Sequence, residues 1–297
     1  MYGASQKYDD LRRRLESLGS VLVAYSGGVD STFLAFAAHA CLGERTMAVL
    51  GVSATVPASE LEGARATADV LGLRLHEVAT HELADPRFQA NPHDRCYYCK
   101  SEMFGVLRGI AGTHDIAWVL DGTNADDTND HRPGRRAARE QGVLSPLLEV
   151  GLNKSEIREL SRGFALPTWA KPSGACLASR FPYGTSITEP MLRQVADAED
   201  GCRALGLVQV RVRTHGNVAR IEVEPSELER AFLLRHDLAA AVRAAGFAFA
   251  TLDLEGYSTG SLNRVVDAAT RSGTQGALSH SSGDLAADNA APSAPTS

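Results

Sequence analysis

Residues 21–32 read Val-Leu-Val-Ala-Tyr-Ser-Gly-Gly-Val-Asp-Ser-Thr, and a helix-compatible run, 33–42, follows them directly. The apolar first half predicts a buried strand that ends at a glycine-containing turn. Such a turn between a strand and a helix presents backbone N–H groups and the positive end of the helix dipole to an anion. The hydroxyl groups of Ser26, Ser31 and Thr32 add further donors. We therefore predict an anion-binding site here; the alternative is a turn that binds no ligand.

Two common phosphate-binding motifs are missing from this turn. It has neither the G-x-x-x-x-G-K-[ST] pattern of a Walker A loop nor the G-x-G-x-x-G pattern of dinucleotide-binding folds. The six residues from Ser26 to Ser31 resemble instead the SGGxDS pyrophosphate loop of the N-type ATP pyrophosphatases. That resemblance implies an enzyme that cleaves ATP between its α- and β-phosphates, adenylates a substrate and releases pyrophosphate.

The composition narrows the class of protein. Of the 297 residues, 44% are hydrophobic and 22% are charged, which suits one large or two modest domains. The formal net charge of −6 offers no general attraction to nucleic acid, so nucleic acid is not the expected partner. No apolar run approaches the roughly 18 residues of a membrane span, and the N-terminus lacks a signal-peptide core. We expect no membrane association and a cytoplasmic location, in which an odd count of five cysteines argues against a disulfide framework.

Short apolar segments alternate with helical segments in the first part of the chain. The predicted strands are 20–25, 46–52, 73–78 and 116–120, and the predicted helices include 7–18, one from a Ser59–Glu62 capping box to about Gly72, and one from Asn153–Glu156 to about Gly163. This alternation predicts an α/β fold with a parallel sheet that helices cover on both faces. Ligands bind such sheets beyond the carboxyl ends of the strands, where Ser26 and Asp121 both lie.

The second part of the chain predicts a smaller α+β domain. A helix is expected from 188 to about 206, a pair of strands at 208–212 and 218–223 joined by a turn at 215–217, further helix over 226–245, and a last strand at 247–254. From about residue 271 the sequence has almost no large apolar residues, which predicts a disordered tail. We therefore expect domains at 1–170 and 171–270, followed by the tail at 271–297.

Three of the five cysteines lie in sequence contexts that suit metal binding or nucleophilic catalysis. Cys96 and Cys99 form a C-x-x-C pair, which could bind a metal, act as a redox pair or be structural. No second C-x-x-C completes a zinc site, but three thiolates can hold a [4Fe–4S] cluster and leave one iron open. Cys176 lies in a polar, turn-rich segment near Lys171 and Arg180, whose charges favour a thiolate nucleophile. The alternative for Cys176 is a small buried hydrophobe.

Charged side chains form two more candidate groups. Carboxylates in the loop after the fourth predicted strand could bind Mg²⁺ or nucleotide hydroxyls, or could simply be solvated: Asp126, Asp127 and Asp130. Arg211 and Arg213 alternate on a predicted strand, so both point to one face and suit a phosphate or carboxylate. The alternative is a solvent-facing basic strand. Glu199 and Glu222 could be metal or sugar ligands, or could form ion pairs with the arginines.

Taken together, these motifs resemble the LarE family over roughly residues 7–265. The segments that carry the resemblance are SGGVDS, RCYYCK, the DGTNADD loop, GLNKSEIREL, ACLASRFPYG, RVRxHGxxARIE and TLDLEGYxxGxLN. The pyrophosphate loop identifies only the superfamily, whereas ACLASRFPYG and RVRxHGxxARIE are far more specific. The resemblance implies ATP-dependent insertion of sulfur into a pyridinium-3,5-biscarboxylic acid mononucleotide, by way of an adenylated carboxylate, in the biosynthesis of the nickel-pincer nucleotide of lactate racemase.

The same resemblance implies a role for each candidate residue. ATP and its pyrophosphate would be bound by Ser26, Gly27, Gly28, Asp30, Ser31 and Asp121, and the substrate phosphate by Arg211 and Arg213. Sulfur transfer would be carried by Cys176, Ser179 and Arg180. Mg²⁺ would be held by Glu199 and Glu222, and a possible [4Fe–4S] cluster by Cys96, Cys99 and Cys176. The family also implies a homo-oligomer that acts on a small nucleotide.

Two versions of the sulfur step follow from the resemblance. In one, Cys176 gives up its own sulfur and becomes dehydroalanine; in the other, the three cysteines hold a cluster that carries an extra sulfide. Because a sacrificial enzyme has no need of Cys96 and Cys99, we favour the cluster. The rival functions are a PP-loop tRNA thiolase, an ammonia-using ligase, which would not need Cys176, and a nucleotide-binding module without catalysis.

Overall fold

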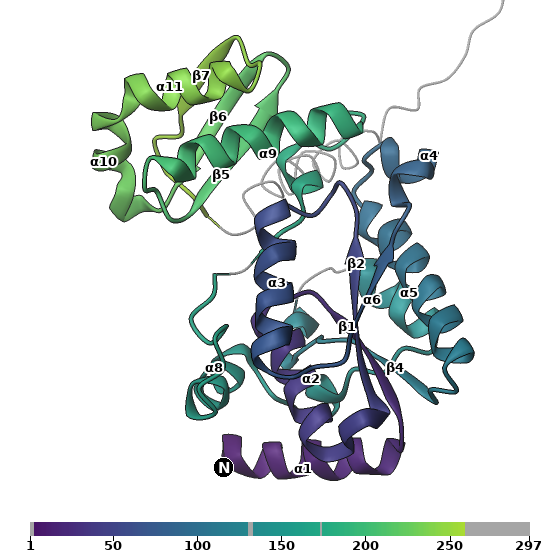
Figure 1. Cartoon of the computed structure of the whole chain (residues 1–297). Helices are drawn as coiled ribbons and strands as arrows, with labels where there is room; N and C mark the ends of the chain where they lie inside the picture. The colour runs from purple at the N-terminus through teal and green to yellow at the C-terminus, as the bar shows by residue number, and fades with distance from the viewer. Residues whose placement is uncertain (1–2, 130–132, 173, 259–297) are drawn as a thin grey trace, which may run out of the picture. The chain divides into compact units, whose positions relative to one another are not determined.

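The computed structural model describes residues 3–129, 133–172 and 174–258, and the part up to Tyr257 forms one compact unit. Its larger sheet has four parallel strands in the order β3-β2-β1-β4 (Figure 1). The strands are β1 Val21–Tyr25, β2 Thr46–Val52, β3 Leu75–Ala79 and β4 Trp118–Leu120. This sheet confirms the predicted α/β fold of the PP-loop type.

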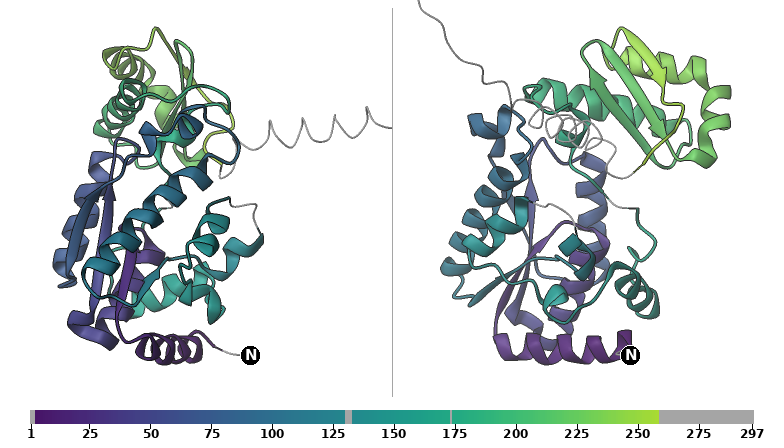
Figure 2. Two further views of the ribbon diagram at one scale, coloured as in Figure 1. Left: turned by 90° about the vertical axis from the view of Figure 1, so that its right-hand side faces the viewer. Right: turned by 180° about the vertical axis from the view of Figure 1, so that it is seen from behind.

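Alternate side chains of the central strands enter two separate cores. Val21, Val23 and Tyr25 of β1 pack with four helices: α1 Ala4–Leu18, α2 Val29–Leu42, α3 Ala58–Val70 and α8 Lys154–Gly163. Leu22, which points to the opposite face, packs with α5 Arg95–Thr113 and α6 Pro133–Glu140. Figures 1 and 2 show α2, α3 and α8 on one face of the sheet and α5 and α6 on the other. Burial on both faces explains why β1 is an unbroken apolar run.

Two helix starts test the expected capping signals. Helix α8 begins as predicted, because the Asn153 side chain accepts from the backbone N–H of Glu156 and the Glu156 side chain accepts from that of Asn153. The capping box predicted at Ser59–Glu62 is wrong. Helix α3 begins at Ala58 after Pro57, and no side chain caps it. Pro57 already fixes the entry of the chain, so the helix begins at Ala58, one residue before Ser59.

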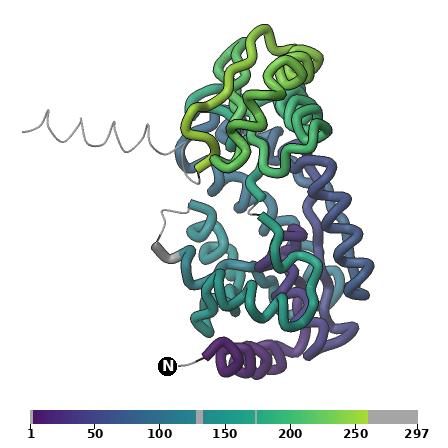
Figure 3. The backbone as a smooth tube through the Cα atoms, turned by 90° about the vertical axis from the view of Figure 1, so that its left-hand side faces the viewer, coloured from purple at the N-terminus to yellow at the C-terminus, as the bar shows by residue number. Residues whose placement is uncertain are grey.

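Helix α1 lies across the end of the sheet at which the strands begin (Figures 1 and 3). Its buried Leu11, Leu15 and Leu18 are the apolar face that the sequence predicts. The remaining short helices of the described chain are η1 Gly43–Arg45, η2 Glu82–Ala84, α4 Pro86–Gln89, η3 Ala125–Asn129, α7 Pro146–Glu149, η4 Leu177–Arg180 and η5 Pro225–Glu227. Within the described residues, no helix combines the length and the apolar character needed to cross a membrane.

A smaller second domain follows, with a mixed sheet of order β5-β6-β7. Its elements are α9 Glu189–Ala204, β5 Val210–His215, β6 Val218–Val223, α10 Leu228–Leu233, α11 Arg235–Ala244 and β7 Phe249–Leu252. The predicted strand pair is present, with β5 antiparallel to β6, while β7 joins β6 in parallel. Phe88, far upstream in the chain, is buried in this domain's core. The predicted boundary near residue 170 stays a prediction, and the predicted tail at 271–297 lies outside the described residues.

Candidate active site

The glycine turn lies between the end of β1 and the start of α2. Gly27 has a φ of +67°, and a side chain there would place its Cβ 2.6 Å from Ala64 Cβ of helix α3. Only glycine satisfies both constraints. The hydroxyls of Ser26 and Ser31 lie 3.0 Å apart, and Ser31 Oγ accepts from the Ser26 N–H at 3.2 Å. The loop is thus held in shape by its own side chains before any ligand arrives.

Asp121, at the end of β4, meets the same loop through the residue that follows it. A Cβ on Gly122 would lie 3.0 Å from the backbone nitrogen of Ser31, so the two chain segments touch backbone to backbone. The Asp121 carboxylate accepts from Ser145 Oγ at 2.7 Å and from Thr123 Oγ1 at 2.8 Å. The structure therefore brings Asp121 beside the loop and uses its oxygens to order the neighbouring turn.

Two lysines reach the loop from distant parts of the chain. Lys154, the first residue of α8, forms an ion pair with Asp30, and Lys171 donates to the Gly27 carbonyl oxygen at 3.0 Å. Lys171 also pairs with Glu60 at 2.8 Å. Neither lysine was predicted to reach the loop, and Lys171 was related only to Cys176. The signal that could have found Lys154 is its place directly after the Asn153 cap, because a helix start is where a parallel α/β fold gathers its site.

Asp30 is a largely buried carboxylate at this end of the sheet, and its surroundings shift its pKa. Burial raises the pKa of its carboxyl, and the hydrogen bond and charge of Lys154 act in the opposite direction. Its Oδ1 atom is buried and has no hydrogen-bond partner among the described residues. A buried carboxylate oxygen without a donor suits Mg²⁺, which prefers oxygen ligands. Asp30 therefore fits the Mg²⁺ that ATP would bring.

The acidic loop after β4 orders the backbone next to the glycine turn. Asp126 accepts from the backbone N–H of Lys154 at 2.9 Å, and Asp127 accepts from that of Asn124 at 3.0 Å. The charge of Asp127 also acts on Asp30. Asp130, the third predicted carboxylate, lies outside the described residues. The loop thus positions the start of α8, and with it Lys154, beside Asp30.

The three candidate cysteines lie on two segments that are far apart in the chain. Cys96 and Cys99 lie in the first turn of α5, and Cys176 directly precedes η4. Burial raises the pKa of the Cys99 thiol, and the charges of Glu82, Cys176 and Cys96 raise it further, so these groups lie within electrostatic reach. Cys96 and Cys176 are exposed. Among the described side chains, no three of His, Cys, Asp or Glu are grouped closely enough to hold a metal ion.

Backbone bonds fix the segment around Cys176. The N–H of Leu177 donates to the carbonyl oxygen of Thr55, in the loop after β2, at 2.8 Å. Ser179 Oγ donates to the Cys176 carbonyl oxygen at 2.8 Å, and Arg180 Nη1 donates to the same oxygen at 3.1 Å. Arg180 is only 1% exposed. Ser179 and Arg180 therefore hold the backbone that presents Cys176.

Arg180 belongs to a buried arginine–glutamate network, formed by Arg180, Glu199 and Arg203 and, next to them, Arg213, Glu222 and Arg220. Glu199 accepts from Arg180 at 2.7 and 3.1 Å and from Arg203 at 2.8 Å. Burial alone would raise the pKa of Glu199, but the hydrogen bond and charge of Arg180 outweigh it, and the pKa is lowered. The carboxylate is therefore held ionised.

The second half of the network lies on the strand pair. Arg213 donates to Glu222 at 2.7 Å and to the Ser179 carbonyl oxygen at 2.7 Å, and Arg220 donates to Glu222 at 3.1 Å. Arg211 stands across the strand pair from Glu222 and lies over the ring of Tyr257 at 5.6 Å. Burial and the charge of Arg180 lower the pKa of Arg211.

This burial decides between the two interpretations of the arginine pair. Arg211 and Arg213 are each 7% exposed, so the alternative of a solvent-facing basic strand is wrong. Glu199 and Glu222 form ion pairs with arginines, the second of the arrangements expected for them. The arginines occupy both oxygens of Glu199 but only Oε1 of Glu222, whose buried Oε2 has no hydrogen-bond partner among the described residues. The predicted roles in binding Mg²⁺ and substrate phosphate stay predictions.

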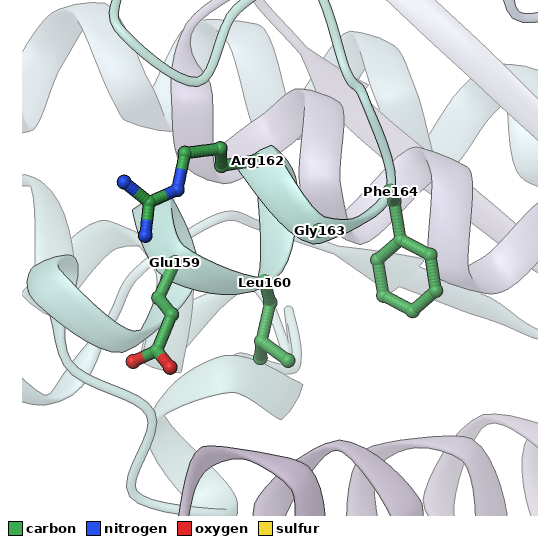
Figure 4. A pocket seen from close by; sticks show the side chains of 5 residues that line it. All are labelled: Glu159, Leu160, Arg162, Gly163 and Phe164. Carbon is green, nitrogen blue, oxygen red and sulfur yellow. The ribbon is translucent and has the colours of Figure 1, made fainter.

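A shallow surface pocket lies apart from all these residues. It is lined by Glu159, Leu160, Arg162, Gly163 and Phe164 at the end of α8 (Figure 4). The side chains of Arg162 and Phe164 point away from one another there. Phe164 instead packs on the rings of Tyr8 and Phe36. The pocket therefore lies beside the place where Phe164 packs on α1 and α2, and it includes none of the candidate site residues.

Strand β1, its glycine loop and helix α2 place the chain in the PP-loop class of ATP-cleaving enzymes. The family model described as asparagine synthase matches residues 8–188, which include the whole parallel sheet. A more distant relative is a glutamine-hydrolysing GMP synthase component of Archaeoglobus fulgidus, 24% identical over 168 residues, or 53% of this chain and 54% of that protein. The family match stops before the second domain, so the class rests on the first.

Two relatives match along most of the chain. One is an uncharacterised protein of Synechocystis sp., 44% identical over 263 residues, which are 88% of this chain and 98% of that protein. The other is the pyridinium-3,5-bisthiocarboxylic acid mononucleotide synthase of Lactiplantibacillus plantarum, 35% identical over 250 residues, which are 84% of this chain and 91% of that protein. The chain belongs to the LarE family, as its motifs predicted, and is an ATP-dependent sulfurtransferase.

Proposed function

We propose that this chain uses ATP to adenylate a ring carboxylate of a pyridinium-3,5-biscarboxylic acid mononucleotide and then converts it to a thiocarboxylate. The product would enter the nickel-pincer nucleotide cofactor of lactate racemase. The observation that carries the proposal is a pyrophosphate loop in the same compact unit as three thiols, Cys96, Cys99 and Cys176, of which Cys96 and Cys176 lie within electrostatic reach of Cys99. The name of the Lactiplantibacillus relative, a bisthiocarboxylic acid synthase, supports the same product.

The adenylation step assigns roles at the end of the parallel sheet. A carboxylate is a poor electrophile, and AMP as leaving group corrects this. The Ser26–Ser31 loop would bind the pyrophosphate through its N–H and hydroxyl groups, and Lys171 would turn from the Gly27 carbonyl to a phosphate oxygen. Asp30 would hold Mg²⁺ through its partnerless Oδ1, while Lys154 keeps its carboxylate in place.

The sulfur step has two forms, and we propose the one that uses all three cysteines. Cys96, Cys99 and Cys176 would hold a [4Fe–4S] cluster, whose open iron supplies a sulfide that is renewed between turnovers. Cys96 and Cys176 are exposed and Cys99 is partly buried, so two of the three thiols are open to an incoming cluster. The residues also allow the sacrificial form. There the Cys176 thiolate attacks the acyl carbon, AMP leaves, and elimination of the Cα proton with the Cβ–S bond leaves dehydroalanine and the thiocarboxylate.

The substrate would lie against the second domain. Arg211 and Arg213 share one face of β5, which supports a role in binding the mononucleotide phosphate. Arg213 already pairs with Glu222, so the phosphate would have to share that guanidinium. Ser179 and Arg180 would fix the Cys176 backbone through their bonds to its carbonyl oxygen. Glu199 and Glu222 would then act chiefly by holding these arginines in place.

One experiment separates the two forms of the sulfur step. The chain is reconstituted anaerobically with iron and sulfide, its iron is counted, and its intact mass is taken before and after reaction with ATP, Mg²⁺ and the biscarboxylate nucleotide. The proposal expects bound iron and an unchanged polypeptide mass. A chain without iron that loses the mass of one H₂S would replace it by the sacrificial form. Release of AMP and pyrophosphate only when the acid is present tests the adenylation itself.

Self-association and location complete the proposal. We propose a homo-oligomer that works in the cytoplasm. Apolar side chains exposed on the second domain support self-association: Phe232, Leu233, Phe249 and Leu254. Light scattering at several protein concentrations would report the mass, and a constant monomer mass would contradict the oligomer.

A further inference from the structure

The segment just before the Cys96–Cys99 pair is bonded to the segment just after Cys176. The N–H of Ile187 donates to the Gln89 carbonyl oxygen at 2.8 Å, and the N–H of Gly184 donates to the Asn91 carbonyl oxygen at 2.9 Å. The two segments are nearly a hundred positions apart in the chain. Cys96 and Cys99 follow the first of these segments, and Cys176 precedes the second.

Asn91 is the residue through which most of these bonds run. It is completely buried, and its backbone has a left-handed φ of +52°, which is uncommon outside glycine. Its Nδ2 donates to the carbonyl oxygens of Pro182 at 2.8 Å and Phe181 at 3.4 Å. With its main chain accepting from Gly184, the one residue holds three backbone groups of the Cys176 segment. Asparagine tolerates this conformation better than most residues and also supplies the amide.

Arg95 extends the connection to the first residue of helix α5. Its Nη1 donates to Asn91 Oδ1 at 2.8 Å, and its guanidinium lies 4.9 Å from the centroid of the Tyr183 ring. The ring of His93 also packs on Tyr183, at 4.3 Å between centroids. Arg95 is 4% exposed, yet its Nε has no hydrogen-bond partner among the described residues. A buried cation kept with so few partners next to two cysteines needs a reason other than stability, because its burial is costly.

We infer that Asn91 and Arg95 are positioning residues that clamp the first turn of α5, with Cys96 and Cys99, against the segment of Cys176. The inference rests on the proposed function for its purpose, since sulfur transfer needs all three sulfurs in one place. The clamp fixes the separation of the thiols through the bonds of Asn91 to the Cys176 segment and of Arg95 to Asn91. Both residues act through the cysteines, because their bonds join the two segments that carry them.

The test measures the thiols themselves. The reduced chain is treated with a short bismaleimide, and the yield of Cys96–Cys176 cross-link is read by peptide mass spectrometry. Asn91→Gly keeps the left-handed backbone free of strain while removing the amide. We expect its cross-link yield to fall about fivefold, the equivalent of one lost buried hydrogen bond. Asp115→Gly is the matched control, because Asp115 has a φ of +53° at the exposed far end of the same helix; its yield should not change.

Kinetic measurements distinguish a positioning role from a merely structural one, because only the sulfur step should slow. Asn91→Gly should slow single-turnover sulfur transfer while the KM for ATP and the release of pyrophosphate stay at the wild-type level. Arg95→Lys, which keeps a cation and a donor, should retain most of the cross-link, whereas Arg95→Met should lose it even if Asn91→Gly fails to fold. Wild-type cross-linking in both Asn91→Gly and Arg95→Met would overturn the inference. A wild-type chain that cross-links but never thiolates the nucleotide would overturn the proposed function and leave the clamp standing.

Discussion

The pyrophosphate loop and the arginine–glutamate network both concentrate charge, but they do so in opposite ways. At the loop, each lysine has one carboxylate partner, and the side chains of Lys154 and Lys171 are 30% and 23% exposed. In the network, Arg180 and Glu199 are 1% and 0% exposed and are bonded on several sides. A ligand at the loop can therefore replace the carboxylate partner of a partly exposed lysine. A ligand at the network would have to share arginines that are already buried and paired. The first region is suited to binding and releasing, and the second to holding a fixed shape.

The largest loss of activity is expected at Asp30, the residue proposed to hold Mg²⁺ beside the loop. Asp30→Ala should remove the Mg²⁺ ligand and leave Lys154 without its partner, so acid-dependent pyrophosphate release should fall by about a thousandfold or more. Pyrophosphate release from ATP is the measurement. Asp69→Ala, at an exposed position of α3, is the control and should behave as wild type. Unchanged release by the Asp30 variant would refute its role.

Breaking the network should cost stability before it costs binding. Glu199→Gln leaves the buried guanidinium of Arg180 without its charge partner, which should lower the free energy of unfolding by about 3–5 kcal/mol. The matched control is Glu149→Gln, since Glu149 pairs with Arg14 at the surface with side chains 36% and 37% exposed; it should cost at most about 1 kcal/mol. Urea titration of both variants gives the comparison, and equal losses would contradict it.

A smaller effect is expected at the second lysine of the loop. Lys171→Met should weaken the hold on the departing pyrophosphate, lowering kcat/KM for ATP by about ten- to a hundredfold. The free energy of unfolding should change little, because the pair with Glu60 is partly exposed. Steady-state rates at several ATP concentrations decide this, with Lys171→Arg as the conservative variant. Wild-type kcat/KM in Lys171→Met would show that Lys171 serves only the loop's structure.

The smallest effect concerns the thiols, which lie outside both regions of the comparison. Because burial and nearby charge raise the pKa of Cys99, its thiol stays protonated at pH 8 and should react with iodoacetamide at least about tenfold more slowly than the exposed Cys176. The difference should shrink as the pH is raised toward the pKa of Cys99. Peptide mass spectrometry at timed intervals gives both rates. Equal rates at pH 8 would show that Cys99 is not shielded as the structure has it.

Local patterns were enough to predict the sheet. Strand β2 begins and ends at the expected residues, Thr46 and Val52, because a strand buried on both faces is a continuous apolar run. Strand β3 begins at Leu75, two residues later than expected, because Leu73 is buried beside the end of α3 and the apolar pattern alone does not separate the two. The capping box at Ser59 failed for a similar reason: the pattern was present, but Pro57 had already started the helix.

The sequence predicted those parts of the candidate site whose residues lie next to one another in the chain. The Ser26–Ser31 loop is one such part, and its anchoring by Lys154 and Lys171 joins residues more than a hundred positions apart, which no local pattern contains. The alternation of Arg211 and Arg213 showed that they share a face, but not that the face is buried. Asn91 was not among the candidate residues. Only the fold shows that its amide bonds to a segment beyond residue 180.

Phe88 belongs by sequence to the first domain and by packing to the core of the second, together with Leu177 and Phe181. On the ribosome, residue 88 emerges long before either partner exists, so an apolar ring stays in water while the second half of the chain is made. We expect the nascent first domain to need a chaperone, or slow folding, until residues 177–187 arrive and cover it. For the same reason, the gene cannot be divided at residue 170 into two halves that are each complete.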